Sequence, residues 1–129
     1  MRTPYPYLLA VVLLAPSSLA AGPTATASAA AGDGYRGYVA CSIKPSAKPK
    51  HGCRLSQVKA AFFLSTKRDA TYKVCVRFPG KAERLCASAQ PAPEGEKQSV
   101  TIATADTGKH QVAWYVGGKK VETWTFEVT

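Results

Sequence analysis

Apolar and polar residues alternate along most of the chain from Tyr35 onward, which is the pattern of half-buried β-strands. No stretch keeps a 3.6-residue apolar period for three turns, so no long amphipathic helix is expected. The pattern predicts seven strands, at residues 35–43, 55–65, 71–78, 84–89, 98–105, 110–116 and 121–128. Short strands at this spacing, with Gly- and Pro-containing turns between them, are typical of an antiparallel β-sandwich.

The clearest local prediction is a hairpin formed by residues 71–78 and 84–89. Alternation assigns to its inner face Tyr72, Val74, Val76, Phe78, Leu85 and Ala87. A turn centred on Gly80-Lys81 joins the two strands, because glycine tolerates a positive φ. A type II turn at Pro79-Gly80, within a four-residue loop, fits equally well, and the sequence leaves both open.

The four cysteines are expected to form two disulfides, because an even number of cysteines in a short exported chain is typical of disulfide bonding. A four-cysteine zinc site needs closely spaced pairs, which this chain lacks. The hairpin register pairs Cys75 with Cys86 on the outer face. By elimination Cys41 pairs with Cys53 and closes the lysine-rich loop 44–52. Each closed loop contributes about 3 kcal/mol in the chain-entropy description.

Residues 1–31 are typical of a secretory signal peptide followed by a short lead of small residues. Arg2 precedes the apolar run Leu8–Ala15, which is much shorter than the ~20 residues of a transmembrane helix. Small residues allow cleavage at several positions from 20 to 31, and Cys41 lies too far along the chain for a lipoprotein anchor. We therefore expect a secreted protein with no membrane span after cleavage and a single domain at residues 35–129.

The motif Asp106-Thr-Gly108-Lys-His110-Gln-Val112 resembles the Asp-x-Gly-x-Tyr-x-Cys signature at the E–F corner of immunoglobulin-like domains. His110 stands in the tyrosine position, and Val112 replaces the cysteine of the inter-sheet disulfide. The resemblance covers residues 106–128 and extends to small secreted immunoglobulin-like proteins of GC-rich bacteria. It implies an immunoglobulin-like β-sandwich and a structural role for Asp106, Gly108 and His110, and it implies no particular activity.

The chain is strongly basic, with a formal net charge of +9 that becomes +8 when Arg2 is removed with the signal. The basic residues form three groups: Lys44, Lys48, Lys50 and Arg54; Lys73, Arg77 and Arg84; and Lys119 with Lys120. The hairpin register places Arg77 opposite Arg84, where the two charges repel each other unless an anion lies between them. An anionic cell-wall polymer or another secreted protein is therefore a candidate partner, and charge that only aids solubility is the alternative.

No pattern in the sequence indicates catalysis, and we predict no catalytic residue, metal or cofactor. The chain contains no GxSxG motif, metal-ligand spacing or phosphate-binding loop. His51 is expected to be a solvated loop residue. Nucleic acid is not an expected partner, because the aromatic residues of the last strands alternate toward the core and do not lie between cations.

The sequence therefore favours a secreted, non-enzymatic binding or accessory domain. The alternative function is a small secreted inhibitor of a protease, because the disulfide-closed loop 44–52 is rich in lysine and would suit trypsin-like enzymes.

Overall fold

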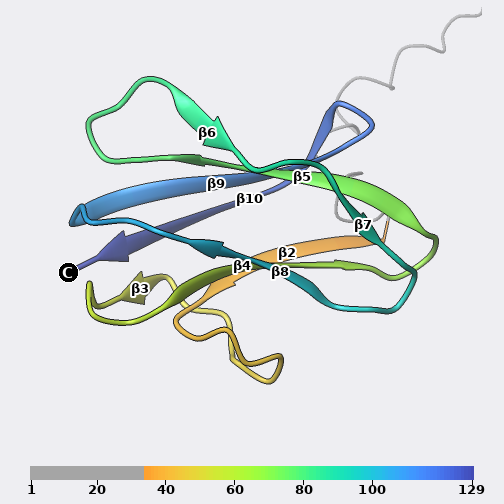
Figure 1. Cartoon of the computed structure of the whole chain (residues 1–129), viewed down its shortest axis with the longest axis horizontal. Coiled ribbons are helices and arrows are strands. Elements are labelled where there is room, and N and C mark those ends of the chain that lie inside the picture. The colour runs from red at the N-terminus through yellow and green to blue at the C-terminus, as the bar shows by residue number, and fades with distance from the viewer. Residues whose placement is uncertain (1–33) are drawn as a thin grey trace, which may run out of the picture.

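The computed structural model describes residues 34–129, which form two β-sheets packed face to face (Figure 1). The larger sheet has the strand order β3-β10-β9-β5-β6, with β7 also paired to β5, and the smaller sheet has the order β2-β4-β8. The strands are β2 (Tyr35–Ala40), β3 (Gly52–Cys53), β4 (Lys59–Ser65), β5 (Ala70–Arg77), β6 (Arg84–Cys86), β7 (Gln90–Ala92), β8 (Gln98–Ile102), β9 (Gly108–Val116) and β10 (Lys119–Val128). The expected signal peptide and lead, residues 1–31, lie outside the described residues. Within residues 34–129 the structure contains no helix able to cross a membrane.

The core lies between the two sheets and consists of the inward side chains that alternation predicts. The largest of the fully buried side chains there are Trp114, Tyr72, Phe63 and Phe126. Trp114 of β9 packs on β2 at Gly37, where a Cβ atom would lie only 2.6 Å from the indole Cδ2. The bare backbone at Gly37 therefore makes room for the largest side chain of the core.

The predicted hairpin is present with the predicted register. Cys75 pairs with Cys86, and Arg77 pairs with Arg84. The turn is the Pro79-Gly80 alternative, because the Lys81 N–H donates to the Phe78 carbonyl at 3.1 Å and Gly80 has φ of +73°. The second strand is shorter than predicted: it ends at Cys86, and residues 90–92 form the separate strand β7, which contacts the first residues of β5.

One residue on the inner face of this hairpin is not buried. Leu85 was expected in the core, but its side chain is 67% exposed. It lines two hollows with Phe78 and Ala103, so it does lie on the inner side of β6. The smaller sheet ends at β8, however, and no further strand covers β6. Alternation identifies the side of the strand, whereas burial also requires a neighbouring layer.

Both expected disulfides are present, Cys41–Cys53 and Cys75–Cys86. The first joins the end of β2 to β3, a two-residue strand that the sequence did not predict and that pairs in parallel with the end of β10. The loop between the two cysteines is attached to the sandwich: the Lys50 N–H donates to the Val39 carbonyl at 2.8 Å, and the Trp124 indole N–H donates to the Lys50 carbonyl at 2.9 Å.

Candidate functional site

The pairing of β6, β5, β9 and β10 arranges the outward side chains of the larger sheet in rows. A row of Lys109 and the carboxylate Glu127 lies at one margin, and three rows follow it. The first row consists of Arg84, Arg77, Gln111 and Thr125. The second consists of the Cys86–Cys75 disulfide, Ala113 and Thr123. The third consists of Lys73, Tyr115 and Lys120. Two rows that carry cations therefore lie on either side of a row of small, uncharged residues.

We call this surface, comprising Lys73, Arg77, Arg84, Gln111, Tyr115, Lys120 and Thr123, the basic face. Its two cationic rows are four residues apart along β5, which corresponds to about 13 Å at ~3.3 Å per residue. Three adjoining shallow cavities, of about 450, 80 and 300 Å³, lie along the face and its margin. None of the three is lined by a carboxylate. The face therefore presents positive charge around an uncharged floor.

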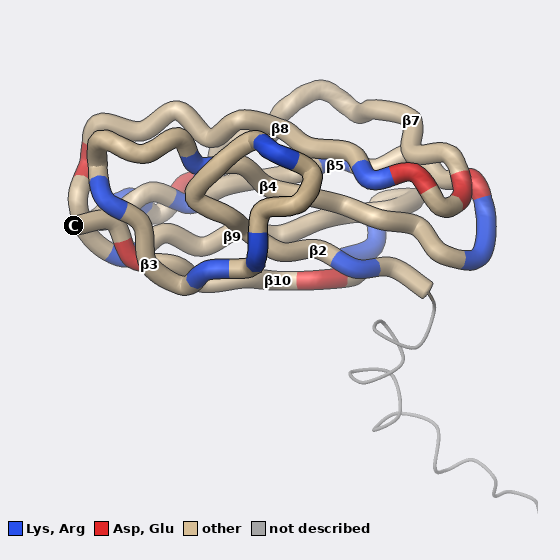
Figure 2. Tube along the Cα trace, turned by 90° about the horizontal axis from the view of Figure 1, so that it is seen from below, with Lys and Arg blue, Asp and Glu red and all other residues tan. Residues whose placement is uncertain are grey.

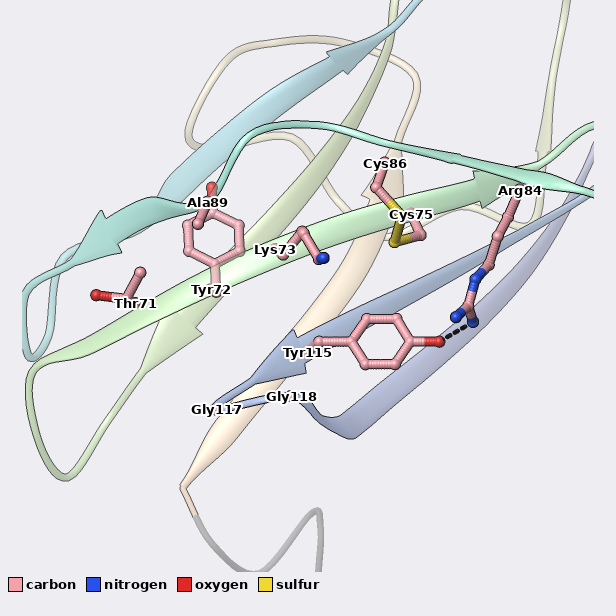
Figure 3. A pocket seen from close by; sticks show the side chains of 10 residues that line it. All are labelled: Thr71, Tyr72, Lys73, Cys75, Arg84, Cys86, Ala89, Tyr115, Gly117 and Gly118. Carbon is pink, nitrogen blue, oxygen red and sulfur yellow. Dashed lines mark hydrogen bonds between the residues drawn. A yellow bond between two sulfur atoms is a disulfide. The ribbon is translucent and has the colours of Figure 1, made fainter.

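Arg84 extends across the floor of the basic face. Its guanidinium donates a hydrogen bond to the Tyr115 hydroxyl and lies over the Tyr115 ring, 5.0 Å from the ring centroid. Figure 3 shows this side chain reaching from β6 to Tyr115, with the Cys75–Cys86 disulfide and Lys73 beside it. The expected repulsion between Arg77 and Arg84 is thus reduced without a bound anion, because Arg84 is directed toward Tyr115.

The structure brings two of the three predicted basic groups together. Lys120, the second residue of β10, lines the same cavity as Arg77 and Arg84. Lys119 is exposed next to it at the start of β10. Within residues 34–129 no carboxylate forms an ion pair with Lys73, Arg77 or Arg84.

The third predicted group lies elsewhere. The loop that carries Lys44, Lys48 and Lys50 packs on the outer side of the smaller sheet, where Ala47 contacts a small cluster around Phe62. The Lys97 ammonium group also binds this loop, because it donates a hydrogen bond to the Pro45 carbonyl oxygen at 2.9 Å. Figure 2 views the molecule from the side of this loop. Arg54 is exposed just after β3. Lys44 and Lys48 therefore belong to the side of the smaller sheet, whereas Lys50 and Arg54 lie beside the edge of the larger sheet formed by β3 and β10.

The two histidines both have fixed surroundings. His110 is fully buried, its Nδ1 lies 3.0 Å from the Gly108 carbonyl oxygen, and its Nε2 lies 3.0 Å from the Thr104 hydroxyl. Because a carbonyl only accepts, Nδ1 carries the proton, and the Thr104 hydroxyl completes the contact at Nε2. His110 therefore occupies the corner as a packed and hydrogen-bonded side chain.

His51 differs from the expectation of a solvated loop residue. It is exposed, but its ring stacks on Trp124 with 4.1 Å between centroids. Its Nδ1 donates to the Thr125 carbonyl at 2.7 Å. Trp124 alternates toward the core but is only half-buried; it packs against the core cluster and against the His51 ring of this loop. Among the described residues, no group of three His, Cys, Asp or Glu side chains has metal-binding geometry.

Sequence reasoning missed several residues next to the predicted cations. Alternation in the strand that contains Tyr115 places this side chain on the outer side, but its contact with Arg84 depends on the pairing of β5 with β9. Lys81, Lys109 and Gln111 line a cavity together with Arg77. The alternation in β9 would have placed Lys109 and Gln111 on the outer side, but only the long-range register places them beside Arg77.

No protein-family model and no curated protein sequence matches this chain. Among solved structures, an immunoglobulin-like protein from Pseudomonas aeruginosa superposes with a TM-score of 0.50 at 9% identity, over 74% of this chain and 91% of that chain. An alkylpurine DNA glycosylase from Pseudomonas fluorescens (TM-score 0.41, 14% identity) aligns with 74% of this chain, which spans 30% of that enzyme. A β-glucosidase from Listeria innocua (TM-score 0.43, 11% identity) aligns with 73% of this chain, which spans 16% of that enzyme.

The similarity to the Pseudomonas aeruginosa protein concerns the fold, and it agrees with the resemblance at residues 106–128. The strand order, the packed corner at His110 and this similarity lead to the same assignment. The described part of the chain is an immunoglobulin-like β-sandwich with two disulfides.

Proposed function

We propose that this protein is an exported, non-enzymatic binding domain, and that its basic face holds an anionic polymer of the cell envelope. The observation that carries the proposal is the convergence of Lys73, Arg77, Arg84 and Lys120 around a floor without carboxylates. The two disulfides support export, because disulfides persist in oxidising compartments. The fold is compatible with many functions, so the proposal depends on this face.

An extended polymer suits this surface better than a compact small ligand. The cavities are shallow and open along the sheet, and they are bordered by cations. Each exposed cation contributes little by itself, since solvent and salt screen single surface charges. A polymer with repeated anionic groups contacts several cations at once, and the separate contributions then add.

Salt dependence tests this function. The secreted protein is applied to immobilised, purified anionic cell-wall polymer, with a neutral glucan as the control. We expect retention on the anionic polymer at low salt and a steep loss of retention as ionic strength rises through 0.1 M, because the Debye length falls to about 10 Å at that salt. The neutral glucan should not retain the protein at any salt concentration. Retention that ignores salt, or equal retention on both polymers, would contradict electrostatic binding.

The protease inhibitor is the second candidate, because a disulfide closes the loop between Cys41 and Cys53 and a backbone hydrogen bond attaches it to β2. Two features of the loop make it the weaker candidate. Lys44 and Lys48 each precede a proline, a bond that trypsin-like enzymes cleave poorly, and the backbone of Lys50 already bonds to Val39 and Trp124. Stoichiometric inhibition of trypsin, lost in the Lys50→Ala variant, would support an inhibitor. Digestion of the loop, or no inhibition, would exclude it.

A further inference from the structure

The Cys75–Cys86 disulfide lies at an accessible place on the surface of the sandwich. Cys86 is exposed and belongs to β6, a strand of three exposed residues at the edge of the larger sheet. Both cysteines line the cavity of about 450 Å³ on the basic face, so a reagent in this cavity reaches the disulfide. Thiols exchange more readily with disulfides that they can approach than with buried ones. The position of this disulfide therefore allows exchange.

The Cys41–Cys53 disulfide in the same molecule provides a comparison. Cys53 is buried, at 3% exposure, and Cys41 is half-buried. Neither cysteine lines a cavity along the basic face or one of the two hollows beside Leu85. Because access limits the rate of thiol exchange, Cys41–Cys53 should exchange more slowly than Cys75–Cys86.

Cations surround the accessible disulfide. Lys73 and Arg84 line the same cavity, and Figure 3 shows their side chains on either side of the two sulfur atoms. Arg77 and Lys120 line the adjoining cavity of about 80 Å³, together with Cys75 and Arg84. Neither cavity is lined by a carboxylate. A group of cations of this kind attracts anionic reagents and stabilises thiolates.

We propose that Cys75–Cys86 is an exchange site for small anionic thiols. The incoming thiolate attacks Sγ of Cys86, because Cys75 is only 2% exposed. A mixed disulfide forms at Cys86, the S–S bond of the protein breaks, and Cys75 leaves as a thiolate with the electron pair of that bond. A second thiolate then displaces Cys86. Two thiols are thus oxidised to one disulfide, and the protein disulfide is reduced to two thiols.

The cations of the basic face promote two parts of this exchange. Lys73 and Arg84 attract the anionic group of the incoming thiol to the larger cavity. Arg77, Arg84 and Lys120 lie around the smaller cavity, where the thiolate of Cys75 forms. Exchange is faster when the leaving thiolate is more stable. The same cations therefore favour both the approach of the reagent and the departure of Cys75.

The edge position of β6 leaves room for the mixed disulfide. Three residue pairs join β6 to β5, and β6 has no other neighbouring strand. Cys86 belongs to neither of the two core clusters. A group attached to Cys86 therefore displaces no side chain of the core.

The exchange also regulates the basic face, an inference that rests on the proposed function. Arg84 lies on β6, two residues before Cys86, and extends from there to Tyr115. With the disulfide open, only the short ladder of β6 holds Arg84 beside Arg77 and Tyr115. The reduced protein should therefore bind the anionic polymer more weakly than the oxidised protein.

Reduction by two dithiols that differ in one charged group tests the exchange site. Dimercaptopropanesulfonate is anionic, and dimercaptopropanol is its neutral analogue. Samples are quenched, alkylated and digested with trypsin, and mass spectrometry then follows each disulfide; cleavage after Arg77 and Arg84 separates Cys75 from Cys86. Cys41–Cys53 corrects for the intrinsic reactivity of the two reagents, since both disulfides are in the same molecule.

At low salt the rate ratio of the anionic to the neutral dithiol should be at least about fivefold larger at Cys75–Cys86 than at Cys41–Cys53. The difference should largely disappear in 1 M salt, where the Debye length is about 3 Å. Lys73→Gln should lower the ratio at Cys75–Cys86 at least about twofold, whereas Arg36→Gln, an exposed position of β2 in the smaller sheet, should not. Equal ratios at the two disulfides, or equal effects of the two substitutions, would overturn the exchange site.

Calorimetry with the anionic polymer tests the regulation. The form with Cys75–Cys86 open and Cys41–Cys53 intact should bind at least about threefold more weakly than the oxidised protein. Equal affinity of the two forms would overturn the regulatory role. The dithiol measurement contains no polymer, so the exchange site stands or falls independently of the proposed function, whereas failure of the oxidised protein to bind would count against that function alone.

Discussion

Arg77 lies directly opposite Arg84 across strands β5 and β6, and Arg84 is directed away from it toward the hydroxyl and ring of Tyr115. Like charges at directly opposed positions of a sheet destabilise it. Tyr115 reduces this cost by holding the guanidinium of Arg84, while both charges stay on the surface. A neutral residue in place of either arginine would make the sheet more stable. The presence of both arginines is therefore consistent with a binding role for the basic face.

The first prediction concerns this pair. Arg77→Gln removes the repulsion and should raise the free energy of unfolding by a few tenths of a kcal/mol at low salt, because opposed like charges cost roughly 0.2–1 kcal/mol. The gain should shrink in 1 M salt, where the Debye length is about 3 Å. Urea unfolding at the two salt concentrations measures both effects. A gain that does not depend on salt would show that repulsion is not its cause.

The second prediction concerns Gly37. Gly37→Ala forces a methyl group to 2.6 Å from the Trp114 indole, so Trp114 or β2 must move. Overpacking of this kind typically costs 1–3 kcal/mol, and we expect a loss of about that size in urea unfolding. Gly52→Ala is the matched control, since the nearest atom to its Cβ would be the Glu127 carbonyl oxygen at 3.9 Å. Equal effects of the two substitutions would contradict the packing of Trp114 on Gly37.

The third prediction concerns Tyr72, whose hydroxyl is buried without a hydrogen-bond partner among the described residues. Tyr72→Phe removes an unsatisfied polar group and should increase stability by about 1 kcal/mol at neutral pH. The test is the difference in urea midpoint between variant and natural protein. A destabilised variant would show that the hydroxyl has a partner, such as an internal water.

The same substitution has a pH signature. Burial raises the pKa of the Tyr72 phenol above its ordinary value of 10.0. Above pH 10 the unfolded chain therefore loses this proton before the folded protein does, and stability falls as pH rises. Tyr72→Phe lacks this loss, so its advantage over the natural protein should widen above pH 10. A constant difference across that range would contradict the burial of an ionisable phenol.

The fourth prediction concerns the Cys41–Cys53 disulfide. Replacing both cysteines by serine opens the loop between residues 12 positions apart and should cost about 3 kcal/mol in urea unfolding. The stacking of His51 on Trp124 depends on this loop, so the fluorescence of Trp124 should shift to the red. A loss below about 1 kcal/mol with unchanged fluorescence would show that hydrogen bonds alone hold the loop.

The sequence predicted what depends on local patterns. Alternation and turn chemistry sufficed for the hairpin, because the register of Cys75 with Cys86 follows from one short loop. The corner at His110 was likewise indicated by a contiguous motif. The two disulfides were also predicted in this way: the hairpin register pairs Cys75 with Cys86, and Cys41 and Cys53 are the two cysteines that remain.

The features that the sequence did not predict depend on long-range packing. Leu85 has the right alternation for a core residue, but the missing neighbour of β8 leaves it exposed. The two-residue strand β3 has no periodicity to detect, and its pairing with β10 fixes His51 on Trp124. The basic face required the pairing of β5 with β9, which brings Lys120 and Tyr115 to the hairpin arginines.

A comparison of two charge-matched variants tests the central claim most directly. In the face variant Lys73, Arg77 and Arg84 become Gln; in the loop variant Lys44, Lys48 and Lys50 become Gln, so each loses three positive charges. Binding to purified anionic cell-wall polymer is measured by isothermal titration calorimetry, after circular dichroism has shown that both variants are folded. Binding through the basic face predicts at least about tenfold weaker binding for the face variant and little change for the loop variant. Equal loss in both variants would show that only net charge matters, and preserved binding in the face variant would contradict the assignment of the site.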